Sequence, residues 1–149
     1  YVGDGNNIVN SWLNLASLIP MDLRIGTAAD TQPDGAILRR AQANPASRVL
    51  LTEDPKEAVA GADVVYTDVW ASMGQKHLAE QKAEKLKKYQ LNSSLLALAD
   101  PKAIVLHCLP AERGREITDE VIDGPHSRVF DEAENRLHIQ KAIMTFLLQ

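Results

Sequence analysis

Short runs of apolar residues, each followed by polar or loop-forming residues, constrain the fold of this chain more than any other feature of its sequence. Such runs stand at 23–27, 49–52, 63–67 and 104–107. Largely continuous apolar runs of this length are typical of strands buried on both faces, as in a parallel sheet covered by helices. We therefore predict a single α/β domain over residues 1–149, with a doubly wound, Rossmann-like parallel sheet and helices on both faces.

The segments between these runs have the signals of helices. Apolar residues recur at helical spacing from Ile8 to Ile19, and Asp54 followed by Pro55 is typical of a helix start. The remaining elements predicted from the sequence are helices at 36–43, 76–88, 94–99, after Thr118 as N-cap and from about Glu132 onward, and short strands at 1–2 and 128–130.

Composition and charge exclude several classes of protein. The net charge is −4 and the basic residues form no long face, which argues against a nucleic-acid partner. No apolar stretch approaches the length of a membrane span, and one cysteine cannot form an internal disulfide. We therefore predict a cytoplasmic protein without a membrane or nucleic-acid partner. The chain opens inside what should be a strand, at Tyr1-Val2, so we also expect it to be part of something longer.

Three polar loops follow predicted strands, at Gly3–Asn7, Asp68–Gln75 and His107–Pro110. Right-handed crossovers bring the carboxyl ends of parallel strands to one edge of the sheet, and ligands of such folds bind at that edge. We therefore expect these three loops to meet and to form the functional site.

His107 and Cys108 stand side by side at the end of the last long apolar run. A thiol next to an imidazole can be held partly as the thiolate, or it can be a polar partner for a substrate amine. The alternative is structural: a buried free cysteine beside a histidine whose hydrogen bonds are satisfied within the protein.

Gly3-Asp4-Gly5, which follows a strand and precedes a helix, has the form of the opening of a dinucleotide-binding loop. The third glycine of that pattern is missing, and no acidic residue stands cleanly at the end of the next strand. A structural turn therefore explains these glycines better. Asn6 and Asn7 indicate a different use, because an amide can donate to a carboxylate and accept from an amine.

Asp68 and Ser72 follow the predicted strand at 63–67. A carboxylate in this place can pair with the ammonium group of a substrate, with a hydroxyl beside it. The alternative is that Asp68 caps the turn and that Ser72-Met73-Gly74 form an ordinary loop.

Four motifs occur along the chain in a fixed order, namely Gly3–Asn7, Asp68–Gln75, His107–Pro110 and Ala133–Arg136. In order and spacing they resemble the second half of the ornithine carbamoyltransferases, and the similarity extends over essentially all 149 residues. The resemblance implies a doubly wound domain that binds L-ornithine, uses no cofactor and works with carbamoyl phosphate as the second substrate. It also implies a separate amino-terminal domain for carbamoyl phosphate, and a homotrimer or a multiple of one in the full-length enzyme.

The same resemblance implies roles for individual residues at the amino-acid end of ornithine. Asn7 would bind that end of the substrate. Asp68 and Ser72 would hold its α-amino group, and the backbone at Met73 would complete the loop.

At the reacting end, the resemblance places Cys108 and His107 beside the side-chain amine. The backbone of Cys108 and Leu109, together with Arg136, would contact the carbamoyl group. An amine attacks a carbonyl only after it loses a proton, and a cationic guanidinium can stabilise the oxyanion, so the chemistry agrees with these roles. Cys108, Asp68 and Arg136 are therefore the predicted catalytic residues.

Three functions compete at this point. The first is one half of an enzyme that carbamoylates ornithine. The second is a stand-alone amino-acid-binding module without chemistry of its own. The third is a dinucleotide-dependent oxidoreductase, which the missing third glycine disfavours.

The last predicted helix has apolar residues around most of its circumference: Leu137, Ile143, Met144, Phe146, Leu147 and Leu148. A helix of this kind is buried on more than one side. We therefore predict that one face packs on the helix's own domain and that the other docks on the amino-terminal domain implied by the resemblance.

Overall fold

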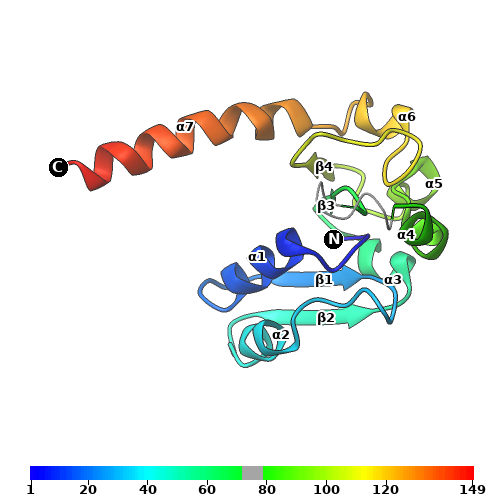
Figure 1. The fold of residues 1–149 in the computed structure, drawn as a ribbon, viewed down its shortest axis with the longest axis horizontal. Coiled ribbons are helices and arrows are strands. Elements are labelled where there is room, and N and C mark those ends of the chain that lie inside the picture. The colour runs from blue at the N-terminus through cyan, green and yellow to red at the C-terminus, as the bar shows by residue number, and fades with distance from the viewer. Residues whose placement is uncertain (72–78) are drawn as a thin grey trace.

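The computed structural model describes residues 1–71 and 79–149, whose strands form two parallel pairs. The pairs are β1 (Asp22–Gly26) with β2 (Arg48–Thr52), and β3 (Val64–Thr67) with β4 (Ile104–His107). The helices, shown in Figure 1, are α1 (Asn7–Ala16), α2 (Gly35–Gln42), α3 (Pro55–Val59), α4 (Ala79–Leu86), the 3₁₀ helix η2 (Lys87–Tyr89), α5 (Ser93–Leu96), α6 (Asp119–Ile122) and α7 (Val129–Leu147).

The first residues of the chain join the two strand pairs into one sheet. Gly26 of β1 donates its N–H to the Tyr1 carbonyl at 2.9 Å, and Gly3 donates to the Gly26 carbonyl at 3.0 Å. On the other side, the N–H of Val2 donates to the carbonyl of Tyr66 in β3 at 3.0 Å. Residues 1–3 therefore act as a short central strand between β1 and β3.

A second short segment extends the sheet beyond β4, where Ser127 forms a parallel bridge with Val105. The spatial order is therefore β2, β1, residues 1–3, β3, β4 and Ser127. This is the strand order of the dinucleotide-binding Rossmann folds, and it confirms the prediction of a doubly wound parallel sheet. The order reverses between residues 1–3 and β3, so the loops after these two strands flank the crevice where such folds bind ligands.

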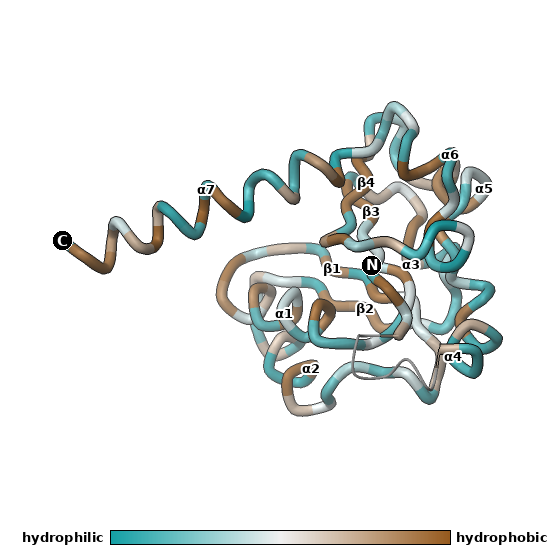
Figure 2. The backbone as a smooth tube through the Cα atoms, turned by 45° about the horizontal axis from the view of Figure 1, so that its top comes forward, coloured by the Kyte–Doolittle hydropathy of each residue, from teal (hydrophilic) through white to brown (hydrophobic). Residues whose placement is uncertain are grey.

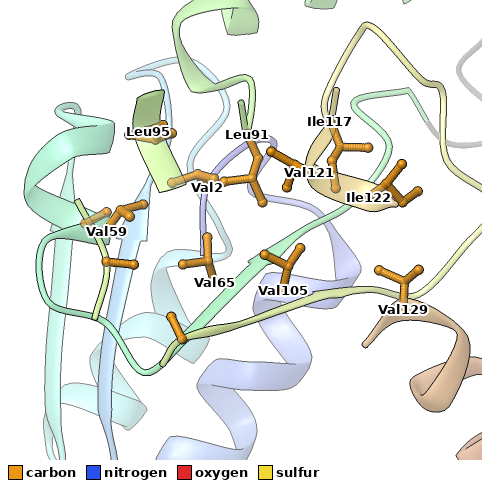
Figure 3. Close-up of a cluster of buried hydrophobic side chains, with 13 residues drawn as sticks. Val2, Val59, Val65, Leu91, Leu95, Val105, Ile117, Val121, Ile122 and Val129 are labelled. Atoms are coloured by element: carbon orange, nitrogen blue, oxygen red, sulfur yellow. The ribbon is translucent and has the colours of Figure 1, made fainter. Parts of the chain in front are cut away.

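Apolar side chains pack on both faces of the sheet. Neighbouring residues of a strand point to opposite faces, so each strand contributes to both. Val65 and Val105 face a cluster that Figure 3 shows together with Val2, Leu91, Leu95, Ile117, Val121, Ile122 and Val129. Tyr66 and Leu106, the next residues along each strand, face a second cluster built largely from α1 and α2. The alternation along β3 and β4 thus places one hydrophobic core on each side of the sheet.

Capping side chains define the first turns of several helices. Asp54 accepts a hydrogen bond from the Lys56 N–H at the start of α3, as predicted. The helix predicted at 94–99 is shorter and begins at Ser93, because Asn92 caps it. Thr118 does precede α6, but its side chain makes no capping hydrogen bond.

The strand predicted at Arg128–Phe130 is wrong. Ser127 makes the bridge to Val105, and the N–H of Arg128 donates to the Val105 carbonyl at 2.9 Å. The Arg128 carbonyl then accepts from the Glu132 N–H at 2.9 Å, so the chain turns directly into α7. Acidic residues in the first turn favour this early start, because they complement the helix dipole.

α7 leaves the body of the protein and ends far from it, with apolar and polar residues alternating along its length (Figures 1 and 2). Only Val129 is buried among the residues of this helix. The prediction that one face of the helix packs on its own domain is therefore wrong. The exposed apolar side chains include Leu137, Ile139, Ile143, Met144, Phe146 and Leu147, each at least half exposed. Across both described ranges, no helix is long and apolar enough to cross a membrane.

Candidate active site

Asp68 lies at the carboxyl end of β3 and joins all three loops that the sequence predicts to converge. Its carboxylate is almost fully buried, with the residue only 5% exposed. Oδ2 accepts a hydrogen bond from Asn6 Nδ2 at 2.7 Å, and Oδ1 accepts from the Val69 N–H at 2.8 Å and from the Cys108 thiol at 3.1 Å. The Gly3–Asn7 loop, the end of β3 and the His107–Pro110 loop therefore meet at one carboxylate.

Asn6 and Asn7 have different surroundings. The side-chain oxygen of Asn6 caps α1 by accepting from the Ile8 and Val9 N–H groups, while its amide donates to Asp68. Asn7 is the first residue of α1 and is exposed. The first turn of a helix attracts anions. The sequence signal for Asn6 is its place before an amphipathic run, which is typical of an N-cap.

Only glycine fits at position 5, because backbone from another part of the chain lies against it. Its N–H donates to the Thr31 carbonyl at 2.7 Å, and a Cβ on Gly5 would lie 2.1 Å from that oxygen. The backbone of the segment after β1 therefore occupies the space beside this glycine. A dinucleotide would need that space for its pyrophosphate, so the structure favours the structural turn.

The Cys108 thiol is half-buried and protonated. Burial and the neighbouring Asp68 carboxylate raise its pKa to about 12. The thiol donates to Asp68, and the imidazole of His107 is bonded elsewhere. The suggestion that the thiol is held partly as thiolate is therefore wrong, and the alternative of a polar partner for a substrate amine remains.

We predict that iodoacetamide alkylates Cys108 slowly at neutral pH, because thiolate is the reacting species and the raised pKa keeps its fraction low. The rate should keep rising above about pH 9, where the rate for an ordinary cysteine approaches its plateau. Asp68→Asn, which removes the adjacent negative charge, should speed the reaction. A wild-type rate profile equal to that of free cysteine would contradict this assignment.

His107 is fully buried, and both of its ring nitrogens are engaged within the protein. Nδ1 accepts from the Leu109 N–H at 2.9 Å, and Nε2 lies 3.1 Å from Glu116 Oε1. The alternative of a satisfied histidine therefore describes its side chain, and we expect no direct contact between this imidazole and a substrate. Glu116 is absent from the sequence prediction because it stands in a charged loop that shows no sign of burial.

Arg136 faces the His107–Pro110 loop across an open hollow of about 530 Å³. The hollow is lined by Cys108, Leu109, Pro110, Ala133, Arg136, Leu137 and Gln140. The first turn of α7 is tied to the sheet by Tyr66, whose hydroxyl donates to Glu132 Oε1 at 2.6 Å. Arg136 stands one helical turn beyond Glu132, so this hydrogen bond helps to aim the guanidinium at the hollow. Neither Tyr66 nor Glu132 has a sequence signal of its own.

Two predicted residues, Ser72 and Met73, lie outside the described residues.

Asp68, His107 and Cys108 offer metal-ligand atoms within 4.8 Å of one another. Each of these side chains is already hydrogen-bonded within the protein. The arrangement therefore fits a hydrogen-bonded substrate site better than a metal centre.

Lys82 of α4 forms an ion pair with Asp4 at 2.8 Å, and both side chains are largely buried. Lys82→Met would leave the Asp4 carboxylate buried beside Asp68, so we expect it to lower the free energy of unfolding by about 1–3 kcal/mol. Lys85→Met is the matched control. Its pair with Asp30 is exposed and screened by solvent, so its loss should change the free energy of unfolding far less. Equal shifts of the two urea midpoints would show that burial does not distinguish the pairs.

The strand order defines a doubly wound α/β domain, and the buried polar cluster lies at the point where this order reverses. Comparison with known proteins identifies the family to which this domain belongs. The chain belongs to the aspartate/ornithine carbamoyltransferase family, since residues 1–147 match its Asp/Orn binding domain.

Relatives and solved structures agree with this assignment. The ornithine carbamoyltransferases of Synechocystis sp. and Geobacter sulfurreducens are each 52% identical to the chain, over 99% and 100% of it and 49% of their own length. The structure is similar to that of the Thermus thermophilus ornithine carbamoyltransferase, with a TM-score of 0.86 and 44% identity over 99% of this chain and 47% of that one. The Campylobacter jejuni ornithine carbamoyltransferase has a TM-score of 0.91 and 34% identity, over 97% of this chain and 49% of that one. The chain thus spans about half the length of these relatives.

Proposed function

We propose that this chain is the ornithine-binding half of an ornithine carbamoyltransferase. The complete enzyme would transfer the carbamoyl group of carbamoyl phosphate to the side-chain amine of L-ornithine, giving L-citrulline and phosphate, in arginine biosynthesis or the related catabolic pathway. The observation that carries the proposal is the buried Asp68 carboxylate, which holds Asn6 and Cys108 at the reversal of the strand order. The family assignment and the names of the relatives support it.

The amino-acid end of ornithine binds at the mouth of the crevice. Asp68 pairs with the α-ammonium group, because a nearly buried carboxylate gains most from a cationic partner. Asn7, exposed at the first turn of α1, receives the α-carboxylate. Ser72 and the backbone of Met73 add further contacts to the α-amino group.

The reacting amine lies against Cys108. The amine reacts in its neutral form, R–NH2. As its nitrogen bonds to the carbamoyl carbon, one of its two N–H protons passes to Cys108 Sγ while the thiol proton moves to Asp68 Oδ1, 3.1 Å away. The backbone of Cys108 and Leu109 holds the carbamoyl group, and Arg136 across the hollow stabilises the oxyanion. The carbon–oxygen bond to phosphate then breaks, and phosphate leaves with the electron pair.

Carbamoyl phosphate needs a partner domain. Arg136 is the one cation among the described residues that line the hollow, and a phosphate group needs more than one. The exposed apolar side chains of α7 supply a surface on which an amino-terminal domain docks. Assembly of the complete enzyme as a homotrimer, or a multiple of one, and a location in the cytoplasm are part of the same proposal.

The test is to fuse the chain to the amino-terminal half of the Synechocystis relative and to measure citrulline. We expect the fusion to form citrulline from ornithine and carbamoyl phosphate, and the isolated chain to form none, because the carbamoyl donor is then neither positioned nor activated. An inactive fusion that still binds ornithine would favour a stand-alone amino-acid-binding module. Citrulline formed by the isolated chain above that of its Arg136→Ala variant would refute the need for the second half.

A further inference from the structure

We propose that Glu116 is a positioning residue for carbamoyl transfer, which acts through His107 on the backbone of Cys108 and Leu109. Its kinetic consequence rests on the proposed function, whereas its structural consequence can be measured on the chain alone. The sequence places Glu116 in a charged loop.

Glu116 is fully buried and its carboxylate collects hydrogen bonds from two directions. Oε1 accepts from the backbone N–H of Glu112 at 2.6 Å and lies 3.1 Å from His107 Nε2. The other oxygen, Oε2, is buried and has no hydrogen-bond partner among the described residues. Burying a carboxylate with one oxygen unpaired is costly, so stability alone does not explain why a glutamate stands here.

The hydrogen bonds fix the tautomer of His107. Leu109 donates its N–H to Nδ1, so this nitrogen carries a lone pair and no proton. The ring proton is then on Nε2, and it points at Glu116 Oε1. A carboxylate is the partner that holds an imidazole in one tautomer and one orientation.

The held imidazole in turn fixes a backbone conformation that the loop would otherwise avoid. Leu109 has a φ of 52°, in the left-handed region that residues with a Cβ rarely adopt. Such a conformation persists only where the surroundings determine it, and the Leu109 N–H is held by His107. Glu116 therefore sets the orientation of the Cys108 and Leu109 backbone toward the carbamoyl group. It acts through its hydrogen bond with His107 and the hydrogen bond from the Leu109 N–H to His107.

The first measurement uses the wild-type chain and needs no variant. Nitrogen-15 NMR of the His107 ring should show a neutral imidazole with its proton on Nε2. The Leu109 amide proton should show the downfield shift of a hydrogen bond to a ring nitrogen. A His107 that is cationic, or that carries its proton on Nδ1, would overturn the proposal.

Two substitutions then separate positioning from a role of the charge. Glu116→Gln keeps an oxygen that accepts from both donors, so the tautomer should stay and the fusion should retain at least about half of its kcat. Glu116→Leu removes the acceptor, so we expect mixed tautomers and a kcat at least about tenfold lower, with the KM for ornithine within about twofold. Glu112→Gln is the control, because its side chain is exposed in the same loop and should change neither readout.

The outcomes distinguish this proposal from the function on which it rests. If Glu116→Gln abolishes turnover, the charge of Glu116 matters and positioning is wrong. If Glu116→Leu does not fold, the wild-type tautomer and the Glu116→Gln variant still decide the question. If the wild-type fusion makes no citrulline, the proposed function fails, while the NMR result still decides how His107 is held.

Discussion

Replacing Cys108 by alanine in the fused protein is expected to lower kcat by about 10²–10⁴-fold, the usual contribution of one positioned proton-transfer group. The thiol is the one described side chain that both borders the hollow and donates to Asp68. Alanine breaks the path from the amine to the carboxylate. Because the side chain is small and half-buried, the free energy of unfolding should change by less than about 1.5 kcal/mol.

Cys108→Ser provides the matched control for this experiment. A hydroxyl can still donate to Asp68 and accept from an amine, so serine should retain more activity than alanine. Stopped-flow or steady-state citrulline assays, run beside urea denaturation of each variant, measure both quantities. An alanine variant with the wild-type kcat would show that the thiol takes no part in the reaction.

Asp68→Asn is expected to weaken the binding of ornithine roughly ten- to a hundredfold, since a charge-assisted contact with an ammonium contributes about 1.5–3 kcal/mol. Carbamoyl phosphate binding should change little, because Asp68 is not among the described residues that line the hollow beside Arg136. Calorimetry with L-norvaline, which keeps the amino-acid end and lacks the reacting amine, measures the effect without turnover.

Equal weakening of both substrates would instead identify Asp68 as a structural cap, as its hydrogen bonds to Asn6 and Val69 allow. The same contacts predict specificity among amines and amino acids. Putrescine lacks the α-carboxylate that Asn7 would bind, and aspartate lacks the side-chain amine, so both should be poor acceptors.

The convergence of the three loops could be predicted from the sequence because it follows from topology. Parallel strands joined by right-handed crossovers bring their carboxyl ends to one edge. Asp68 and Cys108 each follow a recognisable apolar run, so their meeting required no knowledge of packing. Arg136 could be placed only through the resemblance, because it stands on a helix whose direction the sequence does not define.

The partners of these residues could not be predicted, because they depend on packing between segments far apart in the chain. Glu116 and Glu132 look like ordinary surface acids in the sequence. The structure buries the first completely and uses the second to accept from Tyr66, a residue 66 positions earlier. A thiol pKa of about 12 depends in the same way on burial and on Asp68, which adjacency to His107 does not reveal.

The end of the chain was misassigned for a related reason. Arg128-Val129-Phe130 has the composition of a strand, but Ser127 alone forms a bridge with β4. Helical hydrogen bonding begins at the Arg128 carbonyl. The apolar circumference of α7 was correctly identified, but the domain does not cover either face of it. Docking of these side chains on an amino-terminal domain remains a prediction.

A crystal structure of the fused protein with carbamoyl phosphate and L-norvaline tests the location of the site most directly. We expect the α-amino nitrogen of norvaline to lie about 2.7–3.2 Å from an Asp68 carboxylate oxygen, with its side chain directed toward Cys108. The α-carboxylate should lie at Asn7, beside the first turn of α1. Norvaline bound elsewhere, with the Asp68 carboxylate still bonded to Asn6, Val69 and Cys108 as in the free chain, would contradict the assignment of this cluster as the ornithine site.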